Sequence, residues 1–363
     1  MSRLMTLAVS ALALLAAVGT VPEQPAMAAG ANAGKILPSD YVVGSWELYR
    51  AEFVTAEGRV TDDDNGMISH SEGQGYGMLM AVAADDRRSF EQIWDWTRQE
   101  LFIRGDRLAA WRWDPKAMPH VTDLNDATDG DLLIAWALLR ASQKWAVSDY
   151  KVRARGIVDD IADLALADSP YGRVLLPAVT GFDAPSQPDA PVVNLSYWVL
   201  PAIAELEVIS PKLAKAKLID SGLKLIRAAR FGARMLPTDW IGFGASGVEP
   251  AKNFPPHYGY NAVRIPLYLA WYSHDHSDLL APFADAWREA STPAPRVVDV
   301  VSGATVNEMV GPGYLALDDV LQCSLQRAEM VAAAKSFEPT TYYPSTLHIL
   351  SLMALSERYP QCL

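Results

Sequence analysis

Cysteine is nearly absent from the sequence: only Cys323 and Cys362 occur among 363 residues. Two cysteines exclude a disulfide framework and a metal site built from several thiolates. The two residues could pair in an oxidising compartment. Their positions in the sequence do not show whether the geometry allows a bond, so two buried free thiols are an equally good interpretation.

Basic residues are fewer than acidic ones, with 31 Lys and Arg against 43 Asp and Glu, which gives a formal net charge of -12. The Lys and Arg residues also form no cluster along the chain. This charge pattern argues against nucleic acid or an anionic membrane as the partner. It is compatible with a neutral or cationic substrate.

Long apolar runs are missing outside the first residues of the chain. Residues 1–28 have the pattern of a secretory signal peptide, with Arg3, an apolar run over 4–18 and a small-residue cleavage site over 26–28. That run is too short to span a bilayer comfortably. We therefore expect an exported protein, periplasmic or secreted, with a single domain over 29–363 and no membrane association after cleavage.

Common cofactor and metal motifs are also lacking, including H-E-x-x-H, the P-loop and the nucleophile elbow. Gly73-x-Gly75-x-Gly77 lacks the preceding strand of a dinucleotide site. The acidic run over 62–66 has the wrong spacing for an EF-hand, which favours a solvated turn. His274 and His276 lie in a polar segment and are expected at the surface. The sequence therefore predicts no metal and no cofactor.

Helical periodicity dominates what is present, with one short extended segment over 173–195. The expected helices pair closely along the chain, which predicts an all-α fold: a closed toroid of six helical hairpins whose inner helices deliver side chains to one end. The twelve expected helices cover residues 39–56, 71–85, 88–102, 129–145, 148–167, 196–208, 211–231, 258–273, 279–290, 312–321, 323–335 and 342–358.

Two of these helices begin with an acidic residue directly after an expected N-cap. Ser71 and Thr128 each open a capping box, and Glu72 and Asp129 follow them. Compensation of the helix dipole explains an acid in a first turn without any chemistry. However, glycines surround Glu72, and Asp129 lies in a run of three acids whose mutual repulsion is costly.

Two separated carboxyl groups are the requirement for glycoside hydrolysis, in which one group is a protonated acid. A helix N-terminus favours the ionised form, so Glu72 as general acid needs a raised pKa. Burial by Tyr76 and nearby tryptophans, or repulsion from another acid, would supply that rise.

Aromatic residues are plentiful, with 11 Trp and 14 Tyr. Trp94, Trp136 and Trp271 occupy helical positions and are expected in the core. Trp111 and Trp113 lie in a loop before the Asp129 helix, where a sugar-stacking platform and simple packing are equally good interpretations.

These segments together resemble glycoside hydrolase family 8. Residues 127–145 fit the signature of that family, and 71–78 resemble its general-acid motif. Asn194-x-Ser196-Tyr197 and Tyr260-Asn261-Ala262-x-Arg264 also align. The resemblance covers nearly the whole mature chain and is greatest to bacterial endoglucanases, including those of cellulose-synthesis systems.

The resemblance implies an (α/α)6 barrel and inverting hydrolysis of β-1,4-glucan without a cofactor. Glu72 would be the general acid, and Asp129 would hold the sugar at the cleavage point and help to orient the water. A link to the cellulose-synthesis machinery is a further implication. The expected substrate-binding residues are Tyr76, Trp111, Trp113, Tyr197, Tyr260, Asn261 and Arg264.

One position departs from the family pattern, because Asn261 stands where many members carry the Asp general base. An amide cannot accept the proton. The remaining candidates for the base are Asp239, Glu249 and Asp129 itself. Chitosanase, lichenase and xylanase activity stay open as alternatives, as does a catalytically weak glucan-binding accessory of cellulose secretion.

Overall fold

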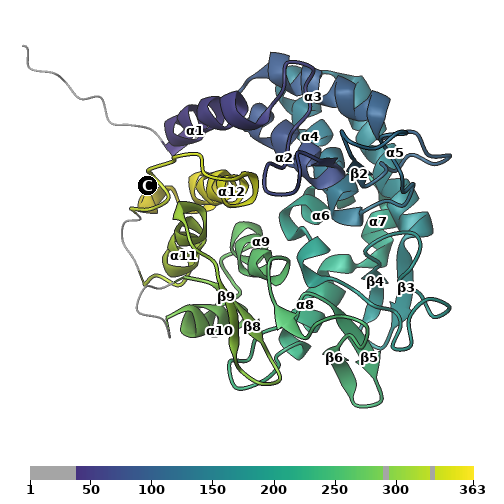
Figure 1. Cartoon of the computed structure of the whole chain (residues 1–363), viewed down its shortest axis with the longest axis vertical. Coiled ribbons are helices and arrows are strands. Elements are labelled where there is room, and N and C mark those ends of the chain that lie inside the picture. The colour runs from purple at the N-terminus through teal and green to yellow at the C-terminus, as the bar shows by residue number, and fades with distance from the viewer. Residues whose placement is uncertain (1–37, 289–293, 328–331) are drawn as a thin grey trace, which may run out of the picture. The chain divides into compact units, whose positions relative to one another are not determined.

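Several helices lie at the centre of the fold and are enclosed by the others, as Figure 1 shows. The computed structural model describes residues 38–288, 294–327 and 332–363, so the expected signal peptide lies outside the described residues. The twelve α-helices of the described residues are α1 Pro38–Phe53, α2 Ser71–Ala83, α3 Arg87–Glu100, α4 Thr128–Trp145, α5 Ser148–Leu164, α6 Leu200–Glu207, α7 Pro211–Ala216, α8 Leu218–Ala228, α9 Ile265–Tyr272, α10 Ser277–Trp287, α11 Pro312–Ser324 and α12 Tyr342–Arg358.

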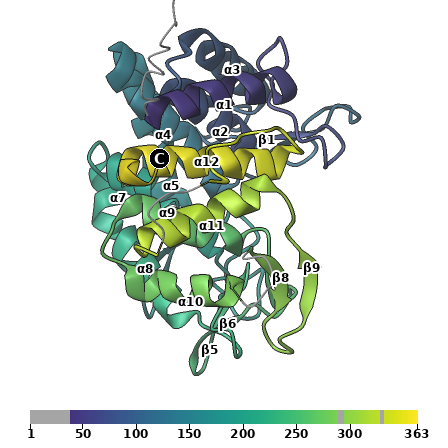
Figure 2. The same cartoon turned by 90° about the vertical axis from the view of Figure 1, so that its left-hand side faces the viewer.

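The fold is the expected (α/α)6 barrel. Helices α2, α4, α6, α9 and α12 are almost entirely buried, whereas α1, α3, α5, α8 and α10 each expose one side. Figure 2 shows α12 between α1 and α11, and it packs against both. Among the described residues, no helix has the length and apolar character needed to cross a membrane.

The glycines of α2 allow it to pack closely against its neighbours. A Cβ on Gly75 would lie 2.6 Å from the Cβ of Leu133 on α4, and a Cβ on Gly77 would lie 2.7 Å from Val60. A Cβ on Gly73 would lie 2.8 Å from the hydroxyl of Tyr342. The three glycines therefore serve helix packing, in agreement with the absence of a nucleotide motif.

The predicted N-caps at Ser71 and Thr128 are wrong. His70 caps α2, and the Thr128 hydroxyl donates to the carbonyl of Leu176 at 2.8 Å. Ala127, which precedes α4, makes no side-chain cap. The chain enters both helices through an extended residue, at position 70 or 127, and this moves each cap one residue earlier than the sequence pattern indicates.

Three of the predicted helices in the C-terminal half are divided or replaced in the structure. The predicted helix over 211–231 is two helices, since Lys217 adopts a left-handed conformation with φ 53°. The predicted helices over 312–321 and 323–335 are replaced by α11, which ends at Ser324. No helix follows within the described part of 325–341. Residues 328–331 lie outside the described residues.

Short strands connect the helices, and sequence periodicity identified only some of them. β3 Leu166–Ser169 and β4 Gly172–Leu175 form a hairpin that overlaps the predicted extended segment. The strands that were not predicted pair as β1–β2, β5–β6 and β7–β8–β9, with bounds β1 Ser69–His70, β2 Arg112–Trp113, β5 Ile241–Gly244, β6 Gly247–Pro250, β7 His257–Tyr258, β8 Arg296–Asp299 and β9 Thr305–Glu308.

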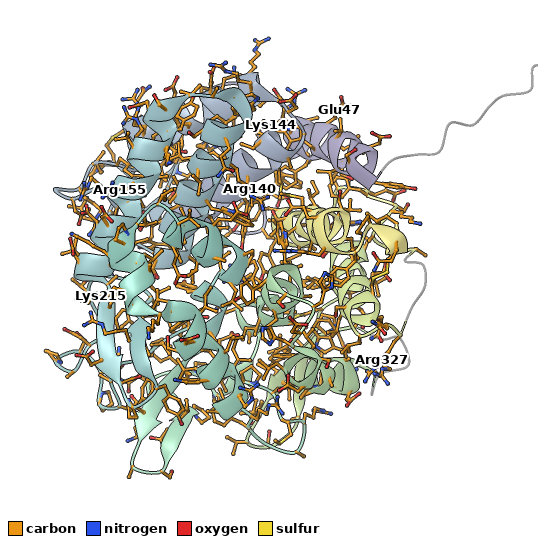
Figure 3. All side chains as sticks on the ribbon, turned by 180° about the vertical axis from the view of Figure 1, so that it is seen from behind. Glu47, Arg140, Lys144, Arg155, Lys215 and Arg327 are labelled. Carbon is orange, nitrogen blue, oxygen red and sulfur yellow. A yellow bond between two sulfur atoms is a disulfide. The ribbon has the colours of Figure 1, made fainter. Side chains whose placement is uncertain are left out.

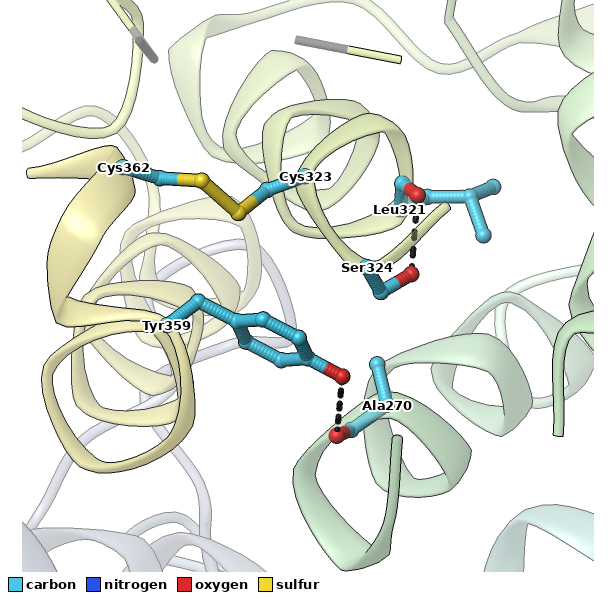
Figure 4. Close-up of a disulfide and its surroundings, with 6 residues drawn as sticks. All are labelled: Ala270, Leu321, Cys323, Ser324, Tyr359 and Cys362. Carbon is cyan, nitrogen blue, oxygen red and sulfur yellow. Dashed lines mark hydrogen bonds between the residues drawn. A yellow bond between two sulfur atoms is a disulfide. The ribbon is translucent and has the colours of Figure 1, made fainter. Parts of the chain in front are cut away.

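A disulfide between Cys323 and Cys362 joins the end of α11 to the 3₁₀ turn that follows α12 (Figure 4). The two Cα atoms lie 6.5 Å apart. Beside this bond, the hydroxyl of Tyr359 donates to the carbonyl of Ala270 on α9 at 2.9 Å. The disulfide decides between the two interpretations of the cysteines in favour of pairing.

Candidate active site

Five helical segments have their N-terminal ends close together in space, and these ends bring polar side chains to one site. They are α2, α4, α12 and two 3₁₀ turns, η1 Leu195–Tyr197 and η2 Ala262–Arg264. Arg264, which is only 2 % exposed, lies at the centre of this group. Helix N-termini carry partial positive charge, and this favours anionic side chains at the point where they meet.

Arg264 connects the four sequence motifs by hydrogen bonds. One guanidinium nitrogen donates to Glu72 and lies 3.5 Å from a carboxylate oxygen of Asp129. The other nitrogen donates to the hydroxyl of Ser196 at 3.0 Å and to the side-chain oxygen of Asn261 at 2.9 Å. The structure therefore brings together the residues that the sequence predicted for the acid half of the site.

Gly130 places Asp129 beside Glu72. A Cβ on Gly130 would lie 2.1 Å from the hydroxyl oxygen of Ser71 and 2.7 Å from the backbone nitrogen of Glu72. The first turns of α2 and α4 therefore touch main chain to main chain, a contact that only glycine permits. It also explains why the Ser71 hydroxyl is buried without a hydrogen-bond partner.

Glu72 and Asp129 share a hydrogen bond and have opposite pKa shifts. Burial acts to raise the pKa of Glu72, but Arg264, His70 and the hydrogen bond from Asp129 together lower it below its usual value. Burial and the charge of Glu72 raise the pKa of Asp129 well above its usual value. These opposite shifts favour the proton on Asp129 over Glu72 when the pair carries one.

The sequence-based expectation that Glu72 has a raised pKa is therefore wrong: the pKa of Glu72 is lowered, and that of Asp129 is raised instead. No pattern in the sequence places Arg264, 192 residues away, against the Glu72 carboxylate. Two hydrogen-bonded carboxyl groups also leave no room for a water between them, whereas inversion requires about 6.5–9.5 Å between acid and base. Asp129 is therefore poorly placed to activate the attacking water from the opposite side.

Asp239 lies next to the position where the family pattern expects the base. Its Oδ1 accepts hydrogen bonds from the backbone nitrogens of Ala262 at 2.7 Å and Gly259 at 3.0 Å. It also shares a hydrogen bond with the side chain of Asn261. Burial raises the pKa of Asp239, although the two backbone hydrogen bonds oppose the rise.

Glu249 has different surroundings. It lies on β6, opposite Gly242 of β5, and its side chain is 36 % exposed. Lys252 is 3.8 Å away and forms an ion pair with it. These contacts are those of a hairpin surface, and none of them links Glu249 to Arg264 or Asn261.

A cleft of about 580 Å³ opens beside Glu72. Its size falls in the range of about 300–1,000 Å³ that is typical of ligand pockets. Sequence reasoning missed most of its wall, although Tyr342 and Tyr343 open a helix in the same way as the predicted site residues. The lining residues are Asp62, Asp64, Asn65, His70, Glu72, Tyr260, Asn261, Arg264, Glu308, Met309, Val310, Tyr314, Thr341, Tyr342, Tyr343 and Pro344.

The predicted tyrosine contacts occupy different environments. Tyr260 is 43 % exposed on the cleft wall, and its hydroxyl accepts a hydrogen bond from Asn307 at 2.8 Å. Tyr197 is half-buried, with the Arg264 guanidinium 5.9 Å from its ring centroid. Tyr76 is fully buried and its hydroxyl lies 3.2 Å from Arg264, so it supports Arg264 and does not face the cleft as a substrate contact would.

The two loop tryptophans also differ from each other. The ring of Trp113 packs against His120, with a centroid distance of 4.2 Å, and the Arg59 guanidinium lies 4.9 Å from it. These contacts favour the packing interpretation for Trp113. The indole nitrogen of Trp111 donates to Asp123 at 2.9 Å, and the ring is partly exposed, so it retains surface on which a sugar could stack.

No cluster of three or more His, Cys, Asp or Glu residues suited to a metal ion occurs in the described part of the chain.

Comparison with known proteins places this site among glycosidases. The family described as "Glycosyl hydrolases family 8" matches residues 16–357. A protein named probable endoglucanase from Novacetimonas hansenii is 37% identical over 322 residues, covering 88% of this chain and 92% of its own length. An endoglucanase from Cellulomonas uda is 33% identical over 336 residues, covering 90% and 92%.

Comparison with solved structures also finds endoglucanases. An endo-β-1,4-glucanase from Acetobacter xylinum superimposes with a TM-score of 0.79 at 34% identity, covering 88% of this chain and 99% of that one. A family 8 endoglucanase from Klebsiella pneumoniae gives a TM-score of 0.78 at 33% identity, covering 87% and 100%.

Proposed function

The chain belongs to glycosyl hydrolase family 8, and on this basis we propose that it is an endo-acting β-1,4-glucanase that hydrolyses its substrate with inversion. The observation that carries the proposal is the Glu72–Asp129 pair, two hydrogen-bonded carboxyl groups that lie beside an open cleft and in contact with Arg264. A glycosidic oxygen bound there would meet a carboxyl group able to protonate it.

Glu72 is the general acid in this proposal, because it is the member of the pair that lines the cleft. The proton of the pair moves from Asp129 along their shared hydrogen bond to Glu72, and Glu72 gives it to the leaving oxygen, so both carboxyl groups are then ionised. The buried Arg264 stabilises this negative charge. Tyr197, Tyr260, Asn261 and Trp111 supply the contacts to the sugar rings.

Asp239 is the general base in this proposal. Its hydrogen bond with Asn261 supports this role, because Asn261 stands where many family members carry the base. The water loses a proton to Asp239 while its oxygen bonds to the anomeric carbon, and the C–O bond to the leaving sugar breaks as Glu72 protonates that oxygen. Glu249 is disfavoured by its exposed ion pair with Lys252.

The first experiment replaces Glu72, the proposed general acid. Glu72→Gln should reduce reducing-end release from carboxymethylcellulose by at least about 10³-fold, since an amide cannot donate the proton. Binding of cello-oligosaccharides, measured by calorimetry, should persist. Unchanged turnover of this variant would refute the assignment.

A second experiment locates the base. Asp239→Asn keeps the side-chain oxygen that accepts the backbone hydrogen bonds of Gly259 and Ala262, so it should fold normally while losing activity. Adding Asn261→Asp to this variant should restore part of the activity, because it returns a carboxylate to the neighbouring position. Full activity of Asp239→Asn would exclude Asp239, and the same assay on Glu249→Gln then tests the remaining candidate.

Asn261 is also the observation that favours a second function, a glucan-binding accessory that has lost its base. Reducing-end release by the wild-type protein separates the two: an accessory binds cello-oligosaccharides and releases no reducing ends. Parallel assays on mixed-linkage glucan, xylan and chitosan define the preferred polymer.

Export of the protein to the periplasm or the medium rests on the leader pattern of residues 1–28, and the Cys323–Cys362 bond supports it because such bonds persist in oxidising compartments. N-terminal sequencing of the mature protein tests it, with cleavage after residue 28 as the expected result. The link to cellulose-synthesis machinery stays a prediction from the family resemblance.

A further inference from the structure

The acidic turn over residues 62–66 lies at the cleft but has no part in the hydrolysis described above. Asp62 is close to His70, with 3.5 Å between the carboxylate oxygen and Nε2. Asp63 accepts a hydrogen bond from the backbone nitrogen of Tyr342 at 2.8 Å. The two neighbouring acids therefore contact the beginnings of two different helices, α2 through His70 and α12 through Tyr342.

His70 is the N-cap of the helix that carries Glu72. Its Nδ1 accepts a hydrogen bond from the backbone nitrogen of Gly73 at 3.0 Å. Glu72 lies between the cap and the capped residue, in the first turn of α2. Loss of the cap would leave that turn free to fray, and the carboxyl group of Glu72 would move with it.

The contacts of His70 require one particular protonation state. Because Nδ1 accepts a hydrogen bond it carries no proton, so the neutral ring carries its proton on Nε2, the nitrogen that faces Asp62. A doubly protonated ring would direct an N–H group at the N–H of Gly73 and break the cap. The ring of Tyr342 packs edge-on against His70 at 5.4 Å, and the side chains of Asp62 and His70 are 13% and 16% exposed.

We infer that His70, held in this tautomer by Asp62, is a positioning residue for the general acid. The pair fixes the first turn of α2 against the first turn of α4, and so keeps Glu72 at its hydrogen-bonded distance from Asp129. This inference rests on the role proposed for Glu72. The charged and titratable groups around His70 are Asp62 from the turn, Glu72 from its own helix and Tyr342 from α12.

The test compares two substitutions of His70. His70→Ala removes the cap and should lower kcat on the order of 10-fold to 100-fold, the effect expected of a displacement of about 1 Å. KM should change less than twofold. His70→Asn keeps a good N-cap acceptor and should recover most of kcat. Melting temperatures of both variants report whether the fold is intact, and His70→Asn remains informative if His70→Ala does not fold.

The role of Asp62 is tested by comparing its substitution with that of Asp63. Asp62→Asn removes the charge that faces Nε2 and should lower kcat severalfold, whereas Asp63→Asn removes one charge from the same turn but keeps an acceptor for Tyr342. We expect Asp63→Asn to retain wild-type kcat. Equal kcat values for the two variants would overturn the role of Asp62.

A His70→Ala variant with wild-type kcat would overturn the inference. Activity of Glu72→Gln would instead overturn the proposed function, which is a separate result.

Discussion

At the scale of single residues, the active site depends on a glycine that makes no chemical contribution. Gly130 lets the backbone of α4 meet that of α2, and the distance between the two carboxyl groups follows from this contact. Arg264 then lowers the pKa of Glu72. The chemistry of the site therefore depends on main-chain packing as much as on the acids themselves.

Gly130→Ala tests this dependence. The added methyl group would meet the hydroxyl oxygen of Ser71 at 2.1 Å and the Glu72 nitrogen at 2.7 Å, so the helices must separate. We expect a loss of about 1–3 kcal/mol in unfolding free energy, as for other overpacked cores, and a fall in kcat on the order of 10²-fold. Chemical denaturation and initial rates measure the two effects.

Gly44→Ala is the matched control for this substitution. Gly44 lies inside α1, and nothing lies within 4 Å of the added Cβ. The variant should gain roughly 0.5–1 kcal/mol from helix propensity and keep wild-type kcat. An unaltered kcat in Gly130→Ala would show that the carboxyl spacing does not depend on this glycine.

Asp131 leads to a prediction of how the stability of the fold depends on pH. It is fully buried, its Oδ1 accepts a hydrogen bond from the backbone nitrogen of Ala109 at 2.8 Å, and its other oxygen has no partner. Burial, with repulsion from Asp126, raises its pKa well above the usual value. Ionisation is therefore easier in the unfolded chain, so this group increasingly destabilises the fold as pH rises from about 4 towards the raised pKa.

Asp131→Asn removes that titration while keeping the acceptor for Ala109. The melting temperature of the variant, relative to wild type, should therefore rise as pH increases from 4 to 7. A constant difference over this range would show that Asp131 does not hold a proton in the folded protein.

At the scale of helices and strands, the structure matches the sequence where burial is continuous. The bounds of α12 agree with the predicted 342–358, and α2 and α4 begin within a residue of the prediction, because long apolar stretches determine them. Strands of two to four residues, such as β7 and β9, carry too little periodicity to be recognised. The break at Lys217 depends on one backbone conformation, which the apolar pattern does not report.

The residues of the candidate site could likewise be predicted from the sequence only where a local motif marks them. Glu72, Asp129 and Arg264 lie in motifs with a local signature, so the amino-acid sequence alone is enough to identify them. Glu308 and Tyr314 line the cleft because β9 and α11 fold back over it, which no local pattern indicates. The lowered pKa of Glu72 was missed because it depends on contact with Arg264, which is 192 residues away in the sequence.

Helix α4 connects the site to a charge cluster about 18 Å further along its axis, at 1.5 Å per residue. Arg140 donates to Glu205 on α6 at 2.7 Å and to Glu357 on α12 at 2.6 Å, and its guanidinium lies 4.3 Å from the ring of Trp136. One side chain thus joins three inner helices. Arg140→Met should cost about 1–3 kcal/mol of unfolding free energy and leave kcat unchanged, as denaturant titration and initial rates would show.

Arg155→Met is the control, and Figure 3 labels both arginines. Arg155 is exposed on α5 and lies 3.6 Å from Asp159, one turn away. Such surface pairs contribute roughly 0.2–0.5 kcal/mol. Equal stability of the two variants would mean that the Arg140 cluster does not hold the helices together.

At the scale of the whole molecule, the Cys323–Cys362 bond closes the C-terminal part of the barrel. The bridged cysteines are 39 residues apart, so loop-closure entropy gives a stabilisation of about 4 kcal/mol. The double variant Cys323→Ala, Cys362→Ala should melt at a lower temperature, with unchanged kcat at 25 °C because neither cysteine lines the cleft. A melting temperature unaffected by reductant would contradict this role.

The charges around the Glu72–Asp129 pair have a consequence for how the polymer arrives. Arg264 offsets part of the negative charge of the pair, whereas Asp62, Asp64 and Glu308 add carboxylates to the same cleft. An uncharged polysaccharide carries no charge for these groups to attract or repel. The affinity for neutral cello-oligosaccharides should for this reason be nearly independent of ionic strength, despite the formal charge of -12 on the chain.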